Sequence, residues 1–141
     1  MATSLADFLY ALPAPSRAPL AVIKWWESRR LAYNYMVGSA GLVTLAAISM
    51  LKMLPGGLPG GGPPAGFLLG GALVYGVLAN LCYFLGPIAE LLCYRLLGED
   101  APRVGPVLYR QGLSFSIGLT LLPILLFGIG SAIGLVVRIF G

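Results

Sequence analysis

The sequence predicts an all-α integral membrane protein with three transmembrane helices and an N-terminal interfacial amphipathic segment. Hydrophobic residues make up 58% of the 141 residues and charged residues only 10%, whereas a soluble domain is about a quarter charged. A chain this short cannot bury so much apolar surface in one core, so lipid must solvate it. The apolar residues also fall in three long runs, separated by segments rich in proline, glycine or charge.

Residues 1–30 are predicted to form a cytoplasmic N-terminal arm that ends in an interfacial helix. Pro19 suits the first turn of a helix, and a helical pattern follows it. In such a position indole rings lie at headgroup depth and guanidinium groups meet lipid phosphates. The residues predicted to anchor the chain at the membrane surface in this way are Trp25, Trp26, Arg29 and Arg30.

Residues 31–141 are predicted to form a three-helix transmembrane domain. About 20 apolar residues are needed to cross the hydrocarbon core, and each run is longer than this. The predicted spans cover residues of about 31–54, 66–94 and 112–137.

Proline and glycine mark the ends and irregular points of these spans. The segments 55–65 and 98–106 contain several helix breakers each and are predicted to be turns. The first of them lacks the lysine or hydroxyl residue of a phosphate-binding loop, so a plain linker is favoured. Pro87 should bend or loosen the second span. Pro123 is interpreted as a static kink in the third span, in preference to a transporter hinge.

The basic residues predict the orientation of the chain. Two of the nine lysine and arginine residues, Lys52 and Arg138, lie on one side of a three-span arrangement. Positive residues stay on the cytoplasmic side during insertion, so we expect a cytoplasmic N-terminus and a C-terminus outside. The seven residues on the cytoplasmic side would be Arg17, Lys24, Arg29, Arg30, Arg95, Arg103 and Arg110.

Glu90 is the acidic residue closest to membrane depth. A carboxylate inside a bilayer often marks a proton or ion pathway. However, Glu90 follows Gly66 by 24 positions, about 36 Å along a helix, which places it at the cytoplasmic interface. An interfacial ion pair with Arg95 is therefore favoured over an ion-translocating site; Arg110 is a second candidate partner.

Two further patterns predict helix packing or contact with a partner. Asn80 and Tyr83 belong to a polar stripe that should turn away from lipid. Small residues four positions apart let helix backbones approach closely, although glycine is common throughout membrane helices. The predicted packing or contact residues are Gly66, Gly70, Asn80, Tyr83, Gly130 and Gly134.

The composition argues against catalysis and against a ligated cofactor. The chain has no histidine, the commonest general base and haem ligand, and its two cysteines cannot complete a zinc site. We therefore expect no enzyme activity, no metal and no cofactor ligated by this chain, although contact with lipid or quinone tails is compatible with its apolar faces. Its basic residues lie beside hydrophobic segments, which favours membrane lipids over nucleic acid as partners.

Three stretches, KWWESRRLAYN, YGVLANLCYFLGPIAELL and YRQGLSFSIGLTLLP, together resemble a group of small, functionally uncharacterised multi-spanning bacterial membrane proteins. The resemblance covers most of the chain outside the Pro/Gly-rich segment. It implies a multi-pass protein of the bacterial inner membrane, and it implies no activity.

Two functional hypotheses follow. The first is a non-catalytic accessory or structural subunit of a larger bacterial membrane complex, such as a photosynthetic or respiratory assembly, whose partners are other membrane protein subunits. The second is a small self-associating transporter or channel with a polar stripe around Glu90. Three spans are too few for an inverted-repeat transporter, so the subunit hypothesis is favoured.

Overall fold

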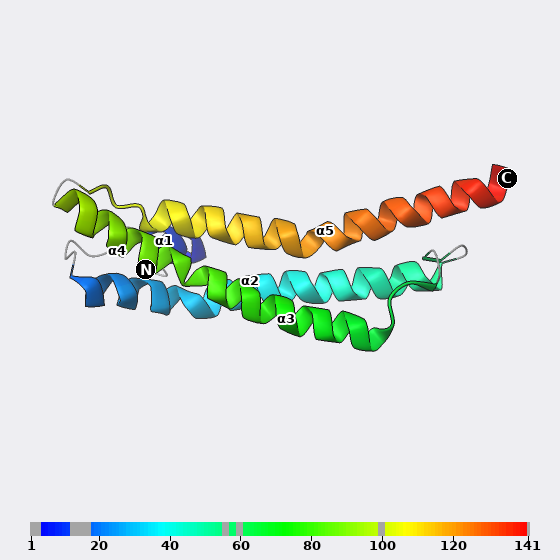
Figure 1. Cartoon of the computed structure of the whole chain (residues 1–141), viewed down its shortest axis with the longest axis horizontal. Helices are drawn as coiled ribbons and strands as arrows, with labels where there is room; N and C mark the ends of the chain where they lie inside the picture. The colour runs from blue at the N-terminus through cyan, green and yellow to red at the C-terminus, as the bar shows by residue number, and fades with distance from the viewer. Residues whose placement is uncertain (1–3, 12–17, 55–56, 59–60, 99–100, 141) are drawn as a thin grey trace. The chain divides into compact units, whose positions relative to one another are not determined.

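The structure, a computed structural model, describes residues 4–11, 18–54, 57–58, 61–98 and 101–140. The described residues form helices in the order α1 (Leu5–Tyr10), α2 (Pro19–Met53), α3 (Ala65–Tyr83), α4 (Leu85–Leu97) and α5 (Gly105–Phe140) (Figure 1). No strand occurs within these ranges, which confirms the all-α class. Arg17, counted above in the cytoplasmic group, lies outside the described residues.

Three helical segments are long and apolar enough to cross a membrane, namely Pro19–Met53, Ala65–Leu97 and Gly105–Phe140. They contain 35, 33 and 36 residues, which corresponds to about 50 Å each. The hydrocarbon core of a bilayer is about 30 Å thick, so each segment continues beyond it by about 20 Å. The predicted number of three helices that can span a membrane is confirmed, and these helices extend past the ends predicted for the spans.

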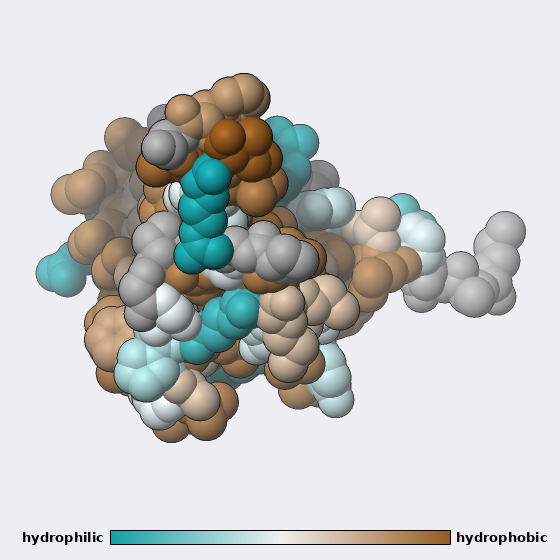
Figure 2. Space-filling view, turned by 90° about the vertical axis from the view of Figure 1, so that its right-hand side faces the viewer, coloured by the Kyte–Doolittle hydropathy of each residue, from teal (hydrophilic) through white to brown (hydrophobic). Residues whose placement is uncertain are grey.

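Large apolar side chains lie on the outside of these helices. Figure 2 views the molecule from the right-hand end of Figure 1, where hydrophobic side chains, drawn in brown, are interspersed with hydrophilic ones, drawn in teal. Hydrocarbon solvates such a surface, whereas in water it would favour aggregation. Exposed apolar residues of α5 include Leu125, Leu126, Ile129, Ile133 and Val137.

The second membrane segment is interrupted at Phe84, between α3 and α4. Pro87 has no amide hydrogen for the carbonyl of Tyr83, four residues earlier, and its ring crowds that carbonyl. The Phe84 N–H instead donates to the carbonyl of Leu81 at 3.2 Å, and helical bonding resumes with Ile88 N–H to Phe84 at 3.3 Å. The irregularity expected from Pro87 is therefore confirmed, and it falls where α3 ends.

Pro123 lies inside α5 and does not end it. In Figure 1 α5 bends within its orange part. The missing amide hydrogen leaves the carbonyl of Leu119 without its helical donor, which accounts for a bend of this kind.

The N-terminal arm contains a short helix, α1, that was not predicted from the sequence. The Ser4 hydroxyl accepts from the Asp7 N–H at 3.1 Å, and the Asp7 carboxylate accepts from the Ser4 N–H at 3.2 Å. This capping box satisfies two backbone donors at the start of the helix. The predicted interfacial helix before residue 31 is no separate element, because it forms the first part of α2.

The chain divides into two compact units, each of which is described by itself. Unit 1 comprises Met1–Tyr35 and Val77–Phe115, and unit 2 comprises Met36–Gly76 and Ser116–Gly141. The sequence of unit 1 holds all five acidic residues and seven of the nine basic residues, so it is the charged unit. The division into an arm of residues 1–30 and a transmembrane domain of 31–141 stays a prediction.

Candidate functional site

Unit 1 has an aromatic core centred on Tyr109 of α5, which is 2% exposed. Its ring makes edge contacts with Trp25 and Tyr83, at centroid distances of 6.3 and 6.4 Å, and a tilted contact with Trp26 at 6.0 Å. These rings come from α2, α3 and α5. Edge-to-face aromatic contacts add to the stabilisation that burial of such large side chains provides. The aromatic residues therefore hold the helices of unit 1 together.

Glu90 of α4 is completely buried beside this core. Its Oε2 accepts from the indole Nε1–H of Trp26 at 2.7 Å, and its Oε1 accepts from the Tyr94 hydroxyl at 2.8 Å. A side-chain carbon at Gly105 would lie only 2.6 Å from Oε2, so glycine lets α5 approach the carboxyl group. Burial of a carboxyl group is unfavourable without hydrogen-bond donors, and here one donor serves each oxygen.

The expected ion pair of Glu90 with Arg95 is not formed, because both carboxyl oxygens accept from other donors and the Arg95 side chain is exposed. The helical geometry explains this difference. Residues five positions apart do not share a helix face, whereas Tyr94, four positions after Glu90, does. An ion pair that does occur in unit 1 joins Arg30 and Glu27, with 3.0 Å between Nη2 and Oε1.

All four predicted surface anchors belong to unit 1, and three of them are buried in it. The side chains of Trp25, Trp26 and Arg29 are 9%, 2% and 5% exposed, so they are covered by other parts of the chain and do not face lipid. The indole of Trp25 donates to the carbonyl of Ala11 at 3.1 Å. Arg30 remains partly exposed and lies over the Phe84 ring, with 4.1 Å from its guanidinium carbon to the centroid. These residues thus differ from the lipid-facing anchor that their types suggested.

Arg29 of α2 links this helix to α1 through hydrogen bonds. Its guanidinium group donates to the carbonyls of Phe8 and Leu9, which lie at the C-terminal end of α1. The same group lies 4.0 Å from the ring centroid of Trp25. A cation near the carbonyls at a helix C-terminus satisfies acceptors that have no partner within the helix. Leu9 is buried at this junction, so α1 is part of the core of unit 1.

Tyr83 contacts a helix of the same chain. Its hydroxyl donates to the carbonyl of Trp26 at 2.6 Å, and its ring centroid lies 4.7 Å from the ring centroid of Tyr33. Asn80 is half-buried one turn earlier on α3. The polar stripe of the second membrane segment therefore faces α2 at Tyr83. Whether Asn80 also contacts a partner stays a prediction.

The four glycines predicted as packing positions lie open. A methyl group placed at any of them would find no heavy atom within 4 Å beyond the adjacent backbone. These positions are Gly66 and Gly70 on α3 and Gly130 and Gly134 on α5. They make no close helix–helix contact among the described residues, so contact with another subunit stays a prediction for them.

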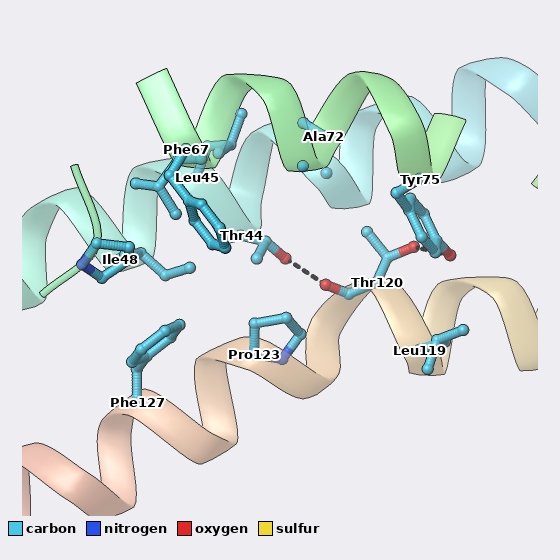
Figure 3. Close-up of a pocket in the computed structure, with 14 residues that line it drawn as sticks. Thr44, Leu45, Ile48, Phe67, Ala72, Tyr75, Leu119, Thr120, Pro123 and Phe127 are labelled. Carbon is cyan, nitrogen blue, oxygen red and sulfur yellow. Dashed lines mark hydrogen bonds between the residues drawn. The ribbon is translucent and has the colours of Figure 1, made fainter. Parts of the chain in front are cut away.

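Unit 2 contains a groove of about 280 Å³ between α2, α3 and α5, shown in Figure 3. Its walls are mainly apolar and include Ile48 of α2, Phe67 and Gly71 of α3, and Pro123 and Phe127 of α5. Most of the surface that a ligand would meet is therefore hydrocarbon. The groove was not predicted, because the residues that form it lie on three separate spans.

The hydroxyl groups that border the groove already have acceptors. Thr44 donates to the carbonyl of Thr120 at 2.7 Å, a bond drawn in Figure 3, and the Thr120 hydroxyl donates to the carbonyl of Ser116 at 2.6 Å. The Tyr75 hydroxyl lies 2.8 Å from the Ser116 carbonyl and 2.7 Å from the Thr120 hydroxyl. These bonds tie α2 and α3 to α5. A ligand in the groove would find little unsatisfied polarity there, which favours an apolar ligand.

One end of the groove carries a positive charge. The Lys52 ammonium group donates to the carbonyl of Pro63, which itself lines the groove. Lys52 is half-buried and forms no ion pair within the described residues. The sequence of unit 2 contains no aspartate or glutamate that could neutralise it. The groove thus joins an apolar interior to an unneutralised cation.

No group of three or more potential metal ligands occurs among the described residues. Comparison of the chain with protein-family models, with characterised proteins and with solved structures finds no match.

Proposed function

We propose that the chain is a non-catalytic accessory or structural subunit of a larger bacterial membrane complex, such as a photosynthetic or respiratory assembly. The observation that carries this proposal is the open glycine faces on α3 and α5. In this proposal other membrane protein subunits pack on these faces. The chain lies in the inner membrane with a cytoplasmic N-terminus and a C-terminus outside, as its distribution of basic residues favours.

The open faces support a partner because glycine has a specific effect in a membrane helix. Helices associate in lipid through close packing, and glycine at four-residue spacing lets two backbones approach. Gly66 with Gly70, and Gly130 with Gly134, have this spacing, and a Cβ atom at any of them meets no other heavy atom of the described residues within 4 Å beyond the adjacent backbone. A second subunit would use the close approach that the chain itself leaves unused.

The alternative of a self-associating transporter or channel gains no support from Glu90. A residue of an ion pathway must be reached by water or by the ion. Glu90 is 0% exposed, and Trp26 and Tyr94 each donate to one of its oxygens. Its surroundings favour a structural role, and the subunit proposal requires nothing more of it.

Leucine at both Gly130 and Gly134 should weaken association by about tenfold, because it separates the two backbones and removes roughly 1.4 kcal/mol of packing. The chain and its double variant would be extracted from the native membrane in mild detergent and compared on a native gel. Membrane insertion should be unchanged because leucine is fully compatible with lipid. Resistance of the chain to alkaline extraction measures this insertion.

The matched control is Gly112→Leu. Gly112 lies on the same helix, and a Cβ atom there also meets nothing within 4 Å, but it was not assigned to a packing face. We expect this variant to associate as the original chain does. Unchanged association of the Gly130/Gly134 double variant would contradict a role for this face, and a band composed of this chain alone would favour the self-associating alternative.

A further inference from the structure

We propose that the groove of unit 2 binds one acyl chain of an anionic phospholipid, with the lipid phosphate beside Lys52. This inference goes beyond the subunit proposal and does not depend on it. It rests on the shape and chemistry of the groove and on the charge at its end.

The chemistry of the groove selects a hydrocarbon occupant. Phe67, Pro123 and Phe127 present apolar surface (Figure 3), and Gly71 leaves space where another residue would place a side chain. The hydroxyls of Thr44 and Thr120 donate to backbone carbonyls. A polar group inserted here would lose its hydrogen bonds to water without gaining a free hydrogen-bond partner. An acyl chain has no such hydrogen bonds to lose.

The length of the groove suits part of an acyl chain. Its α2 wall runs from Gly41 to Ile48, a distance of about 10 Å along the helix. Lys52 follows Ile48 by one further turn, so the ammonium group lies beyond the apolar section, near Pro63. An apolar section that ends at a cation matches a lipid, in which a hydrocarbon tail ends at a charged headgroup.

The charge of Lys52 favours an anionic headgroup. Within the part of the chain that the structure describes, its ammonium group donates to a neutral carbonyl, that of Pro63. The sequence of unit 2 supplies no acidic residue to compensate the charge. A basic residue near a membrane surface attracts anionic lipid, and the resulting preference is about fivefold for each charge. Phosphatidylglycerol should therefore bind in preference to phosphatidylcholine with the same chains.

The test measures lipid retained by the full chain. The purified protein would be exchanged into mixed vesicles of palmitoyl-oleoyl phosphatidylglycerol and phosphatidylcholine, extracted in mild detergent, and its bound lipid counted by native mass spectrometry. We expect about one phosphatidylglycerol per chain, enriched about fivefold over phosphatidylcholine. Equal retention of both lipids, or retention of an isoprenoid quinone in place of phospholipid, would overturn the proposal.

Two variants separate the groove from the charge. Gly71→Leu should fill the groove and remove the bound lipid, and a Cβ atom at this position meets no heavy atom within 4 Å beyond the adjacent backbone. Gly38→Leu is its matched control, because Gly38 of unit 2 is equally open, does not line the groove and belongs to no proposed packing face. Lys52→Gln retains a donor for the carbonyl of Pro63 and should abolish the headgroup preference while the acyl chain stays bound. Arg138→Gln is the control for the loss of one charge.

A photoreactive phosphatidylglycerol with a diazirine in its acyl chain gives a second measurement that needs no variant. Crosslinks should concentrate on peptides that contain Phe67, Tyr75 and Phe127, which line the groove. Crosslinks spread equally over exposed residues outside it, such as Ile133 of α5, would contradict the proposed site.

Discussion

Replacement of Glu90 by leucine is expected to lower the free energy of unfolding of unit 1 by about 2–4 kcal/mol. The change removes the acceptor of the Trp26 indole N–H and of the Tyr94 hydroxyl. A donor left without an acceptor in a buried position is destabilising by about 1–3 kcal/mol, and relief from burying the carboxyl group offsets part of the sum. Leucine has no group that can replace either bond.

Tryptophan emission during unfolding in detergent measures this effect specifically. The chain has two tryptophans, Trp25 and Trp26, and both are buried in unit 1. Glu90→Gln retains one carbonyl acceptor, so its loss should be about 1 kcal/mol. Glu27→Gln changes an exposed acid of the same unit and should have an effect below about 1 kcal/mol. If Glu90→Leu unfolded at the same temperature as the original chain, the carboxyl group would have no structural role.

Replacement of Gly86 by alanine is expected to destabilise unit 1 by about 1–3 kcal/mol. The new methyl group would lie 2.3–2.8 Å from three carbon atoms of the Trp26 indole. That ring cannot move freely, because its N–H donates a hydrogen bond to Glu90 and the Tyr83 ring packs against it, with 5.5 Å between the ring centroids. Overpacking of a filled core typically has an effect of this size. The emission maximum of Trp26 should also shift as the indole is displaced.

Gly112→Ala is the matched control for this overpacking. Gly112 lies in α5, and a side-chain carbon there meets no atom within 4 Å. Alanine is favoured over glycine in a helix by up to about 1 kcal/mol, so this variant should be as stable as the original chain or slightly more stable. Equal stability of the Gly86 and Gly112 variants would contradict the close contact between Gly86 and Trp26.

The helical segments and their interruptions were predictable because both depend on local sequence. Long apolar runs specify helices in lipid, where every backbone group must be bonded within the segment. Pro87 acts on the carbonyl four residues earlier, and the helix does end at Tyr83. The helix α1 could also have been predicted, because Ser4 and Asp7 have the spacing of a capping box.

The packing inside unit 1 was harder to predict from the sequence, because its contacts join distant parts of the chain. Trp26 and Glu90 are 64 positions apart, and residue types alone place a tryptophan at the membrane surface on average. Here Glu90 supplies an acceptor for one indole and Ala11 for the other, so both rings are buried. The groove of unit 2 presented the same difficulty, since Thr44 meets Thr120 across 76 positions.

The two units suggest a division of roles within one short chain. In unit 1, the buried charged and aromatic groups of Arg29, Glu90 and Tyr109 are enclosed by the chain itself. Unit 2 has an apolar groove and open glycines, including Gly130 and Gly134. Self-contained packing in unit 1 provides stability, whereas the unfilled surfaces of unit 2 are suited to lipid and to neighbouring helices.

Extraction of the unmodified chain from its native membrane in mild detergent, followed by a native gel and mass spectrometry of the band, tests the subunit proposal most directly. The account predicts that the chain migrates within a large complex of fixed composition, whose other subunits are then identified. Migration of the chain alone, or only with copies of itself, would contradict it.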